Sequence, residues 1–245
     1  MTEFKSPLVV IPARLSSARL PKKLLELVHG KPIIYWTYQA AAKAGVGDVV
    51  VAVDSAVIAD ELNVWRIPNV LTSPDCCNGT ERVYEVARIY TSYEFFVNVQ
   101  GDEPLLNPET VRVLVESGME SGVFKTAISP IADGGNSSEV KVAVSTDNRI
   151  RFASRAKIPF SRDSTPNYHK IHGVYMYCRE TLQTFVNSKK GPLEEIEQVE
   201  QLRCIENDIP LVGVVTPHTE RSVDTLADLT YMRSQPLSKF LNENR

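Results

Sequence analysis

Strand-sized runs of apolar, mostly β-branched residues alternate with amphipathic stretches along the first half of this chain. Residues 8–11 and 49–53 are predicted strands, and a third predicted strand covers residues 94–99. This alternation is typical of βαβ units, in which helices cover a mostly parallel sheet. We therefore expect an α/β fold with a mostly parallel central sheet flanked by helices.

Helix boundaries are marked by capping residues. Pro32 is expected to open a helix that continues to about Lys43 and that Gly45 ends, because proline favours the first turn and glycine the position after the last. Further helices are predicted after Ser55, over residues 80–90, after Asn107, from near Pro192, and after Thr225 with Asp228 three residues on.

The middle of the chain changes character. Residues 140–144, 150–153 and 173–178 are predicted to be extended, and a last strand is expected at 211–215. No repeat or obvious linker interrupts the sequence. We predict one domain over residues 1–245, with a β-rich insertion at about 130–190.

Composition excludes several classes of protein. The hydrophobic fraction of 43% and the charged fraction of 23% are ordinary for soluble proteins, and the apolar runs are too short to span a bilayer. No secretory signal follows Met1, and the four cysteines show no CxxC pair. A net charge of -3 gives no general attraction to nucleic acid. We expect a cytoplasmic protein with no membrane insertion and no nucleic-acid partner.

A basic loop follows the first predicted strand, where open α/β sheets form ligand crevices. Its cations face only one acid, Glu26, and a small anionic ligand could bind there. The cations are Arg14, Arg19, Lys22, Lys23 and Lys31. Neither GxxxxGK[ST] nor GxGxxG is present, so the loop is not a standard phosphate-binding motif. A solvated basic surface is the alternative.

Two acids stand at positions where a metal could bind. Asp102 follows the predicted strand 94–99, and Asp224 precedes a predicted helix. Each is either a cap or a magnesium ligand, since Mg²⁺ prefers hard oxygen ligands. If they faced each other at about 4 Å, their repulsion would cost about 4 kcal/mol at an effective dielectric near 20, and a divalent cation would remove that cost. The residues alone therefore predict an α/β protein that binds a phosphorylated ligand.

The order and spacing of several motifs resemble one family, the 3-deoxy-manno-octulosonate cytidylyltransferases, also called CMP-Kdo synthetases. The resemblance covers nearly the whole chain. Its motifs are Ile11-Pro12-Ala13-Arg14 to Arg19-Leu20-Pro21, Gly79-Thr80-Glu81-Arg82, Asn98-Val99-Gln100-Gly101-Asp102-Glu103-Pro104, Val140-Lys141-Val142, Ser154-Arg155-Ala156 with Ile158-Pro159, Gly173-Val174-Tyr175, Pro192-Leu193-Glu194, Glu200-Gln201-Leu202-Arg203 and Val223-Asp224-Thr225.

This resemblance implies a nucleotidyltransferase-like fold, a homodimer, CTP as donor and Mg²⁺ as cofactor. The acceptor would be 3-deoxy-manno-octulosonic acid (Kdo) or a close 3-deoxy-2-ulosonic acid, and the insertion would supply the sugar pocket and dimer contacts. It also implies roles for individual residues: Arg14, Lys23 and Asp102 in catalysis; Arg14, Arg19, Lys23, Arg82 and Asp102 at CTP; Asp102 and Asp224 at the metal; and Gln100, Arg155, Tyr175, Glu200 and Gln201 at the sugar.

The chain departs from the family pattern at three places. Lys22 replaces the usual glycine before the catalytic lysine, and Leu24 replaces the proline after it. Cys77 and Asn78 replace a Gln or Glu followed by Ser. Ahead of Gly173, the usual histidine position holds Ile171, and the histidine is one residue later, at His172. Because a one-residue shift on a strand turns a side chain to the other face, His172 should not inherit the sugar contact.

Other functions remain open at this point. The acceptor could be an 8-amino-Kdo or a nonulosonic acid rather than Kdo. The chain could also be a nucleotidyltransferase that acts on a sugar 1-phosphate, or a non-catalytic nucleotide-binding regulator on the same fold.

Overall fold

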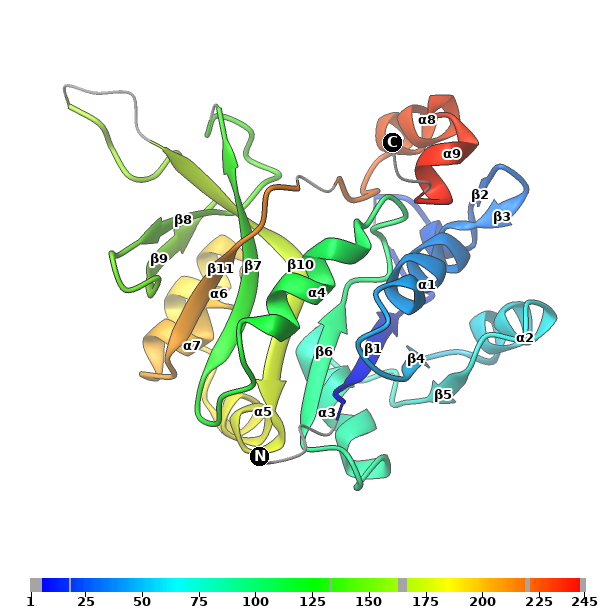
Figure 1. The fold of residues 1–245 in the computed structure, drawn as a ribbon, viewed down its shortest axis with the longest axis horizontal. Coiled ribbons are helices and arrows are strands. Elements are labelled where there is room, and N and C mark those ends of the chain that lie inside the picture. Colours follow the sequence, from blue (N-terminus) through cyan, green and yellow to red (C-terminus); the bar gives the residue numbers. More distant parts are fainter. Residues whose placement is uncertain (1–5, 18, 133, 163–166, 219–220, 243–245) are drawn as a thin grey trace. The chain divides into compact units, whose positions relative to one another are not determined.

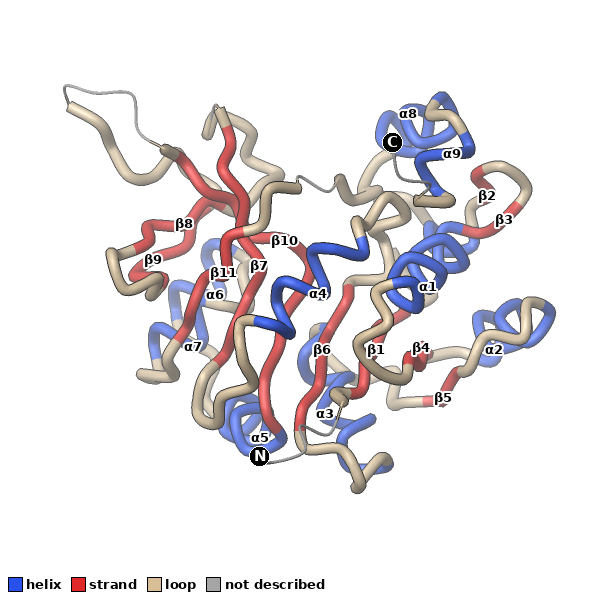
Figure 2. Tube along the Cα trace, in the orientation of Figure 1, coloured by secondary structure: helices blue, strands red, loops and turns tan. Residues whose placement is uncertain are grey.

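The computed structural model describes residues 6–17, 19–132, 134–162, 167–218 and 221–242. The chain divides into two compact units, residues 1–112 with 220–245 and residues 113–219. The elements of both units can be followed in Figure 1, and Figure 2 colours them by type.

The first unit alternates strands and helices. Its elements are β1 (Leu8–Ala13), η1 (Lys23–Leu25), β2 (Leu27–Val28), β3 (Lys31–Pro32), α1 (Ile33–Lys43), β4 (Val49–Val53), α2 (Ala56–Val64), β5 (Asn69–Leu71), α3 (Gly79–Ile89), β6 (Phe95–Val99), α8 (Leu226–Ser234) and α9 (Leu237–Phe240). Helix α4 (Pro108–Glu116) contains the boundary between the units.

The four main strands of the first unit form a parallel sheet in the order β6-β1-β4-β5. Strand β1 is central, and all six of its residues are buried. Val10 pairs with Val50 on one side and with Asn98 on the other. The predicted strands 8–11, 49–53 and 94–99 are confirmed as β1, β4 and β6, and so is the α/β class.

The order of the strands contains a reversal beside β1. From β1 the chain runs outward to β4 and β5 and then returns to the other side of β1 as β6. Right-handed crossovers in opposite directions put α1 and α3 on opposite faces, and in Figure 1 α1 lies in front of the sheet while α3 lies behind it. The reversal lies between β1 and β6, and ligands bind at the carboxyl ends of strands at such a point.

Local capping explains where the helices of the first unit begin. Helix α1 starts after Pro32, as predicted. The side chains of Ser55 and Asn78 accept backbone N–H groups of α2 and α3. Thr225 and Asp228 form a complete capping box at α8, which satisfies two N–H groups that would otherwise lack partners.

The second unit is richer in antiparallel strands. Its elements are β7 (Phe124–Ile131), β8 (Lys141–Val144), β9 (Ile150–Ser154), β10 (Tyr168–Cys178), α5 (Arg179–Asn187), α6 (Pro192–Glu197), α7 (Leu202–Glu206) and β11 (Leu211–Val215). Strand β10 is antiparallel to both β7 and β8, β8 is antiparallel to β9, and β11 is parallel to β7. The single domain with an insertion at 130–190 stays a prediction; Asp133 and residues 163–166 of that range lie outside the described residues.

Strand β7 has no counterpart among the strands predicted from sequence. Its first six residues are all buried, so it lacks the alternation of a half-buried strand, and Lys125 interrupts its apolar run. The Lys125 ammonium donates hydrogen bonds to the carbonyls of Ser117 and Gly118, at 3.1 and 2.7 Å. These carbonyls follow α4, where cations are stabilised, and the charge is thereby accommodated within the fold.

No helix in the described part of the chain is both long and apolar enough to cross a membrane.

Candidate active site

Three charged side chains of the first unit meet where the loops after β1 and β6 approach residues 221–225. The Lys23 ammonium donates to Asp102 Oδ2 at 2.5 Å and to Asp224 Oδ1 at 3.1 Å. It also donates to the carbonyl oxygen of Val223, at 3.0 Å. Residues far apart in sequence therefore form one cluster, which we call the carboxylate–lysine cluster (Lys23, Asp102 and Asp224).

The backbone holds this cluster in place. The Val223 N–H donates to the Asp102 carbonyl oxygen at 2.9 Å, and the two acids are thus on segments joined directly to each other. The capping box of α8 begins at Thr225 and fixes the residue before it. Gly101 allows the close approach on the other side, since a Cβ there would lie 2.9 Å from the Pro12 carbonyl oxygen.

The two candidate lysines differ clearly in their surroundings. The Lys23 side chain is only 13% exposed. Burial acts to lower the pKa of Lys23, but the Asp102 and Asp224 carboxylates outweigh it and raise that pKa above its usual value, and Lys23 stays protonated at neutral pH. Lys22 is exposed and has a left-handed backbone, with φ of 54°. Of the two, Lys23 is therefore the lysine at the acids.

The predicted triphosphate arginines lie on the same loop. Arg14 is exposed directly after β1. The Arg19 guanidinium is 2.8 Å from Asp224 Oδ1, and 61% of its side chain remains exposed. Lys31 is separate, because its ammonium lies 3.5 Å from the centre of the Trp65 ring. Ala18, between the two arginines, lies outside the described residues.

Arg82 is the buried member of the predicted nucleotide site. It is 3% exposed, and it donates to the Thr72 hydroxyl at 2.6 Å and to the Ser73 carbonyl at 3.0 Å. Its guanidinium also lies 3.8 Å from Asp54, whose other oxygen accepts the Leu15 N–H at 2.9 Å. Arg82 and Asp54 thus connect the loops after β1, β4 and β5.

Asp54 was not among the residues predicted from sequence. The signal was present, because Asp54 follows β4 directly, as the Gln100-Gly101-Asp102 segment follows β6. Carboxyl ends of parallel strands meet at one edge of a sheet, and an acid after any of them is a candidate for the same site.

The unusual residues ahead of α3 preserve its N-terminus. The Asn78 side chain accepts the Glu81 N–H at 2.8 Å, and the Glu81 carboxylate accepts the Cys77 N–H at 2.8 Å. Asparagine is as good a cap as serine, and the departure at Asn78 therefore does not cost the helix its cap. Burial is the main cause that raises the pKa of the Cys76 thiol, to about 11, and it is a poor nucleophile at neutral pH.

The residues predicted for the sugar are divided between the units. Gln100 follows β6 in the first unit, where its Nε2 atom donates to Asn98 Oδ1 at 3.2 Å. Arg155, Tyr175, Glu200 and Gln201 belong to the second unit.

Arg155 makes an extensive set of backbone contacts. Its guanidinium donates to the carbonyls of Glu197 at 2.9 Å and Gln198 at 3.3 Å, and to those of Ser137 and Ser138 at 3.3 and 3.2 Å. The Glu197 carboxylate accepts the Arg155 N–H at 2.9 Å. Arg155 therefore ties the end of α6 to the loop ahead of β8, and its role at the sugar stays a prediction.

The other three predicted sugar residues occupy two places. Gln201 is 4% exposed and donates to Glu200 Oε1 at 3.3 Å, just after α6. Tyr175 lies in β10, is 7% exposed, and packs against Phe124 with ring centres 5.8 Å apart. Their roles at the sugar also stay predictions.

Three charged residues of the matching motifs are internal supports of the second unit. Arg203 and Glu194 are both 4% exposed and form a two-pronged ion pair with both contacts at 2.7 Å, in the geometry that favours arginine. Lys141 is fully buried and donates to the carbonyls of Asn136, Glu139 and Arg155. Burial lowers the pKa of Lys141.

The predicted shift at Ile171 agrees with the burial pattern of β10. Buried and half-buried residues alternate from Tyr168 to Gly173; Ile171 is half-buried, whereas His172 is 3% exposed. The two side chains therefore point to opposite faces.

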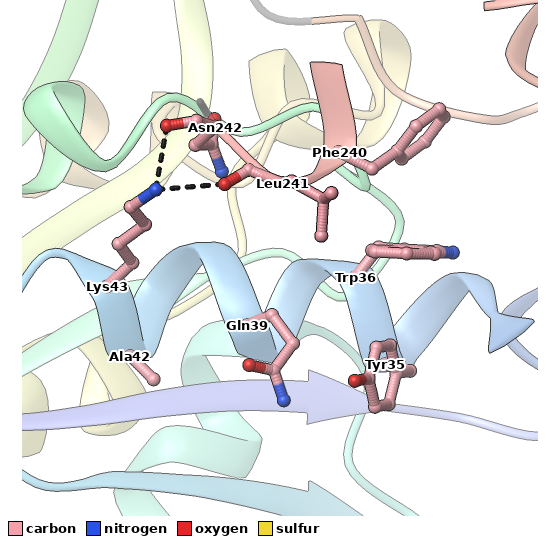
Figure 3. A pocket seen from close by; sticks show the side chains of 8 residues that line it. All are labelled: Tyr35, Trp36, Gln39, Ala42, Lys43, Phe240, Leu241 and Asn242. Carbon is pink, nitrogen blue, oxygen red and sulfur yellow. Dashed lines mark hydrogen bonds between the residues drawn. The ribbon is translucent and has the colours of Figure 1, made fainter. Parts of the chain in front are cut away.

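A hollow of about 260 Å³ lies away from these residues, between α1 and α9. Figure 3 shows Trp36 and Phe240 at one end and Lys43 at the other, where its ammonium donates to the carbonyls of Leu241 and Asn242. None of its lining residues was a predicted site residue. The lysine attaches the C-terminal segment to α1.

Comparison with known proteins identifies the family. The sequence profile of a family described as cytidylyltransferase matches residues 8–211. The chain is 41% identical over 229 residues to the 3-deoxy-manno-octulosonate cytidylyltransferase of Lawsonia intracellularis, covering 90% of each chain. It is 35% identical over 241 residues to that of Paramagnetospirillum magneticum, covering 94% of this chain and 97% of the relative.

Solved structures agree with this assignment. A CMP:2-keto-3-deoxy-manno-octonic acid synthetase complexed with CTP is similar with a TM-score of 0.87 and 32% identity, covering 94% of this chain and 98% of that one. An inositol-1-phosphate CTP transferase from T. maritima, 14% identical with a TM-score of 0.66, covers 98% of this chain and 99% of its own, and shares the fold. The chain is an enzyme, a nucleotidyltransferase, and it belongs to the 3-deoxy-manno-octulosonate cytidylyltransferase family.

Proposed function

We propose that this enzyme transfers CMP from CTP to the anomeric hydroxyl of a 3-deoxy-2-ulosonic acid, Kdo or a close relative, and releases pyrophosphate. The carboxylate–lysine cluster carries the proposal, because it places two acids and a cation at the carboxyl ends of β1 and β6. The names of the relatives and the CTP bound in the similar structure support the choice of substrates.

The reaction is a direct displacement. The anomeric oxygen forms a bond to the α-phosphorus of CTP, the bond from that phosphorus to the bridging oxygen breaks, and the hydroxyl proton is lost to solvent. Positioning and neutralisation of charge supply most of the catalysis in reactions of this kind. Lys23, Arg19 and Arg14, on the loop after β1, are the cations that would neutralise the phosphates.

We propose that Asp102 and Asp224 hold Mg²⁺. The contacts of Lys23 support this proposal. Its ammonium group already lies against both carboxylates, so the two acids can share one positive charge. Among the described residues no group of three or more His, Cys, Asp or Glu could hold a metal. Two carboxylates suffice for Mg²⁺, which takes its remaining ligands from water and substrate phosphates. Bound there, the ion would act as a Lewis acid toward the phosphates.

The homodimer is likewise proposed from the resemblance. One described feature supports it, Phe160, which is 90% exposed within the predicted insertion. Exposed aromatic side chains of this kind are enriched at protein interfaces.

The proposal is tested by measuring pyrophosphate release with each of the common nucleoside triphosphates and several acceptors. We expect release with CTP and a 3-deoxy-2-ulosonic acid, and its loss when EDTA removes divalent cations. Release with UTP or dTTP and a sugar 1-phosphate would establish the competing transferase reaction. CTP binding without pyrophosphate release for every acceptor would overturn the proposed reaction.

The choice of acceptor is tested at Ile171. A hydroxyl of Kdo that faced this apolar side chain would lack a hydrogen-bond partner, and such sites discriminate against their ligand. We expect Ile171→His to raise kcat/KM for Kdo about threefold or more. Efficiencies for Kdo, 8-amino-Kdo and a nonulosonic acid are compared in the native enzyme, in Ile171→His and in Ile171→Val as the apolar control. A native preference for Kdo with no gain on adding His would show that the departure is neutral.

A further inference from the structure

Asn98 is a fully buried polar residue in the middle of the sheet of the first unit. It lies in β6, opposite Val10 of β1, and its side chain is 0% exposed. No described residue accepts a hydrogen bond from its Nδ2 atom. Leaving a buried donor unpaired costs stability, and an apolar residue would suit this position better if only the fold mattered.

Within the described part of the chain, the Asn98 side chain forms its one hydrogen bond with Gln100. Residues two apart on a strand point to the same face, and Asn98 Oδ1 accepts from Gln100 Nε2 at 3.2 Å. The Gln100 amide has a nitrogen that donates and an oxygen that accepts. With its nitrogen bound to Asn98, its oxygen and second N–H are available to a ligand at the end of β6.

Gly79, the first residue of α3, borders the same amide. A Cβ at this position would lie 2.6 Å from Gln100 Nε2 and 3.5 Å from Asn98 Nδ2. The Gln100 amide therefore occupies the space that any other side chain at position 79 would need. Gly79 and Asn98 together confine it.

We propose that Asn98 is a positioning residue: it fixes the orientation of the Gln100 amide, so that the same amide atoms are always presented to the acceptor sugar. The inference rests on the proposed function for what Gln100 binds, and on the contacts of Asn98 and Gly79 for how Gln100 is held. Pre-orienting the amide lowers the conformational-entropy cost of binding the sugar.

The kinetic test uses Asn98→Leu, which keeps the side-chain size and removes the oxygen that accepts the hydrogen bond from Gln100. We expect KM for the acceptor sugar to rise about five- to tenfold and KM for CTP to stay within about twofold of native. The thermal unfolding midpoint should stay equal or rise. Gly79 does not have a positive φ, so Gly79→Ala should displace the Gln100 amide without straining the backbone. This variant should also raise KM for the acceptor sugar. A shift of KM for CTP as large as that for the acceptor would overturn the proposal.

A double-mutant cycle separates positioning from a general effect. In the Gln100→Ala background, Asn98→Leu should change KM for the acceptor no further, because the amide that it orients is absent. An equal rise in both backgrounds would overturn the proposal.

A measurement without substrate keeps this test independent of the reaction. The side-chain amide resonance of Gln100, assigned by its loss in Gln100→Ala, should shift in Asn98→Leu. If no acceptor supports pyrophosphate release, the proposed function fails while this shift still supports the positioning role. An unmoved resonance would overturn the positioning role whatever the activity.

Discussion

Asp102→Asn is expected to lower kcat about a thousandfold, equivalent to about 4 kcal/mol of transition-state stabilisation. The substitution keeps the size of the side chain, but a neutral amide is a weaker ligand for Mg²⁺ and no longer balances the Lys23 charge. Asp224→Asn should act in the same direction, because its carboxylate contacts the same ammonium group. Turnover is measured over a titration of Mg²⁺, from which the apparent metal affinity is obtained.

The matched control is Asp60→Asn, which removes one exposed acid from α2 in the same unit. It should leave both turnover and the magnesium titration unchanged, since exposed charges contribute little at a distance. Near-native rates at saturating Mg²⁺ in either Asp102→Asn or Asp224→Asn would remove that residue from the metal site.

The second large effect is expected at Lys23. Lys23→Ala removes the buried ammonium group, and kcat should fall on the order of a hundredfold to a thousandfold, as when a pre-oriented group that stabilises developing charge is lost. Because the carboxylates raise the pKa of Lys23, its ammonium group is charged at neutral pH before a metal binds.

Lys22→Ala is the control for the same loop. Its side chain is exposed, and alanine meets the same left-handed backbone as lysine does, so the two residues are equivalent for the fold at φ of 54°. We expect turnover within about threefold of native. A larger loss from Lys22→Ala than from Lys23→Ala would mean that Lys22 is the lysine that acts on the phosphates.

Sequence patterns predicted the first unit well because its signals are local. Capping at Ser55 and Thr225 and the strand-sized apolar runs are properties of a few neighbouring residues. Strand β7 was missed because the charge of its buried lysine is accommodated by contacts with the carbonyls of Ser117 and Gly118, which no local pattern contains.

The site was predicted unevenly for a related reason. Chain order cannot show that Asp102 and Asp224 contact one ammonium group, and only the resemblance indicated that they act together. Asp54 follows a buried strand, as Asp102 does, but it lies outside the motifs that resemble the family. Arg155 shows the opposite case: the motif predicts a ligand contact, and the folded chain adds four backbone carbonyls as its partners.

The hydrogen bond between the Val223 N–H and the Asp102 carbonyl attaches a late segment of the chain to an early one, which has a consequence for the order of folding. Lys23 and Asp224, which this segment brings to the cluster, are 201 positions apart, and the whole second unit is synthesised between them. Closing a loop of that length is entropically costly until the intervening segment has become compact. We therefore expect the sheet of the first unit to form early and its active site late, once residues 221–225 have emerged from the ribosome and docked beside β6.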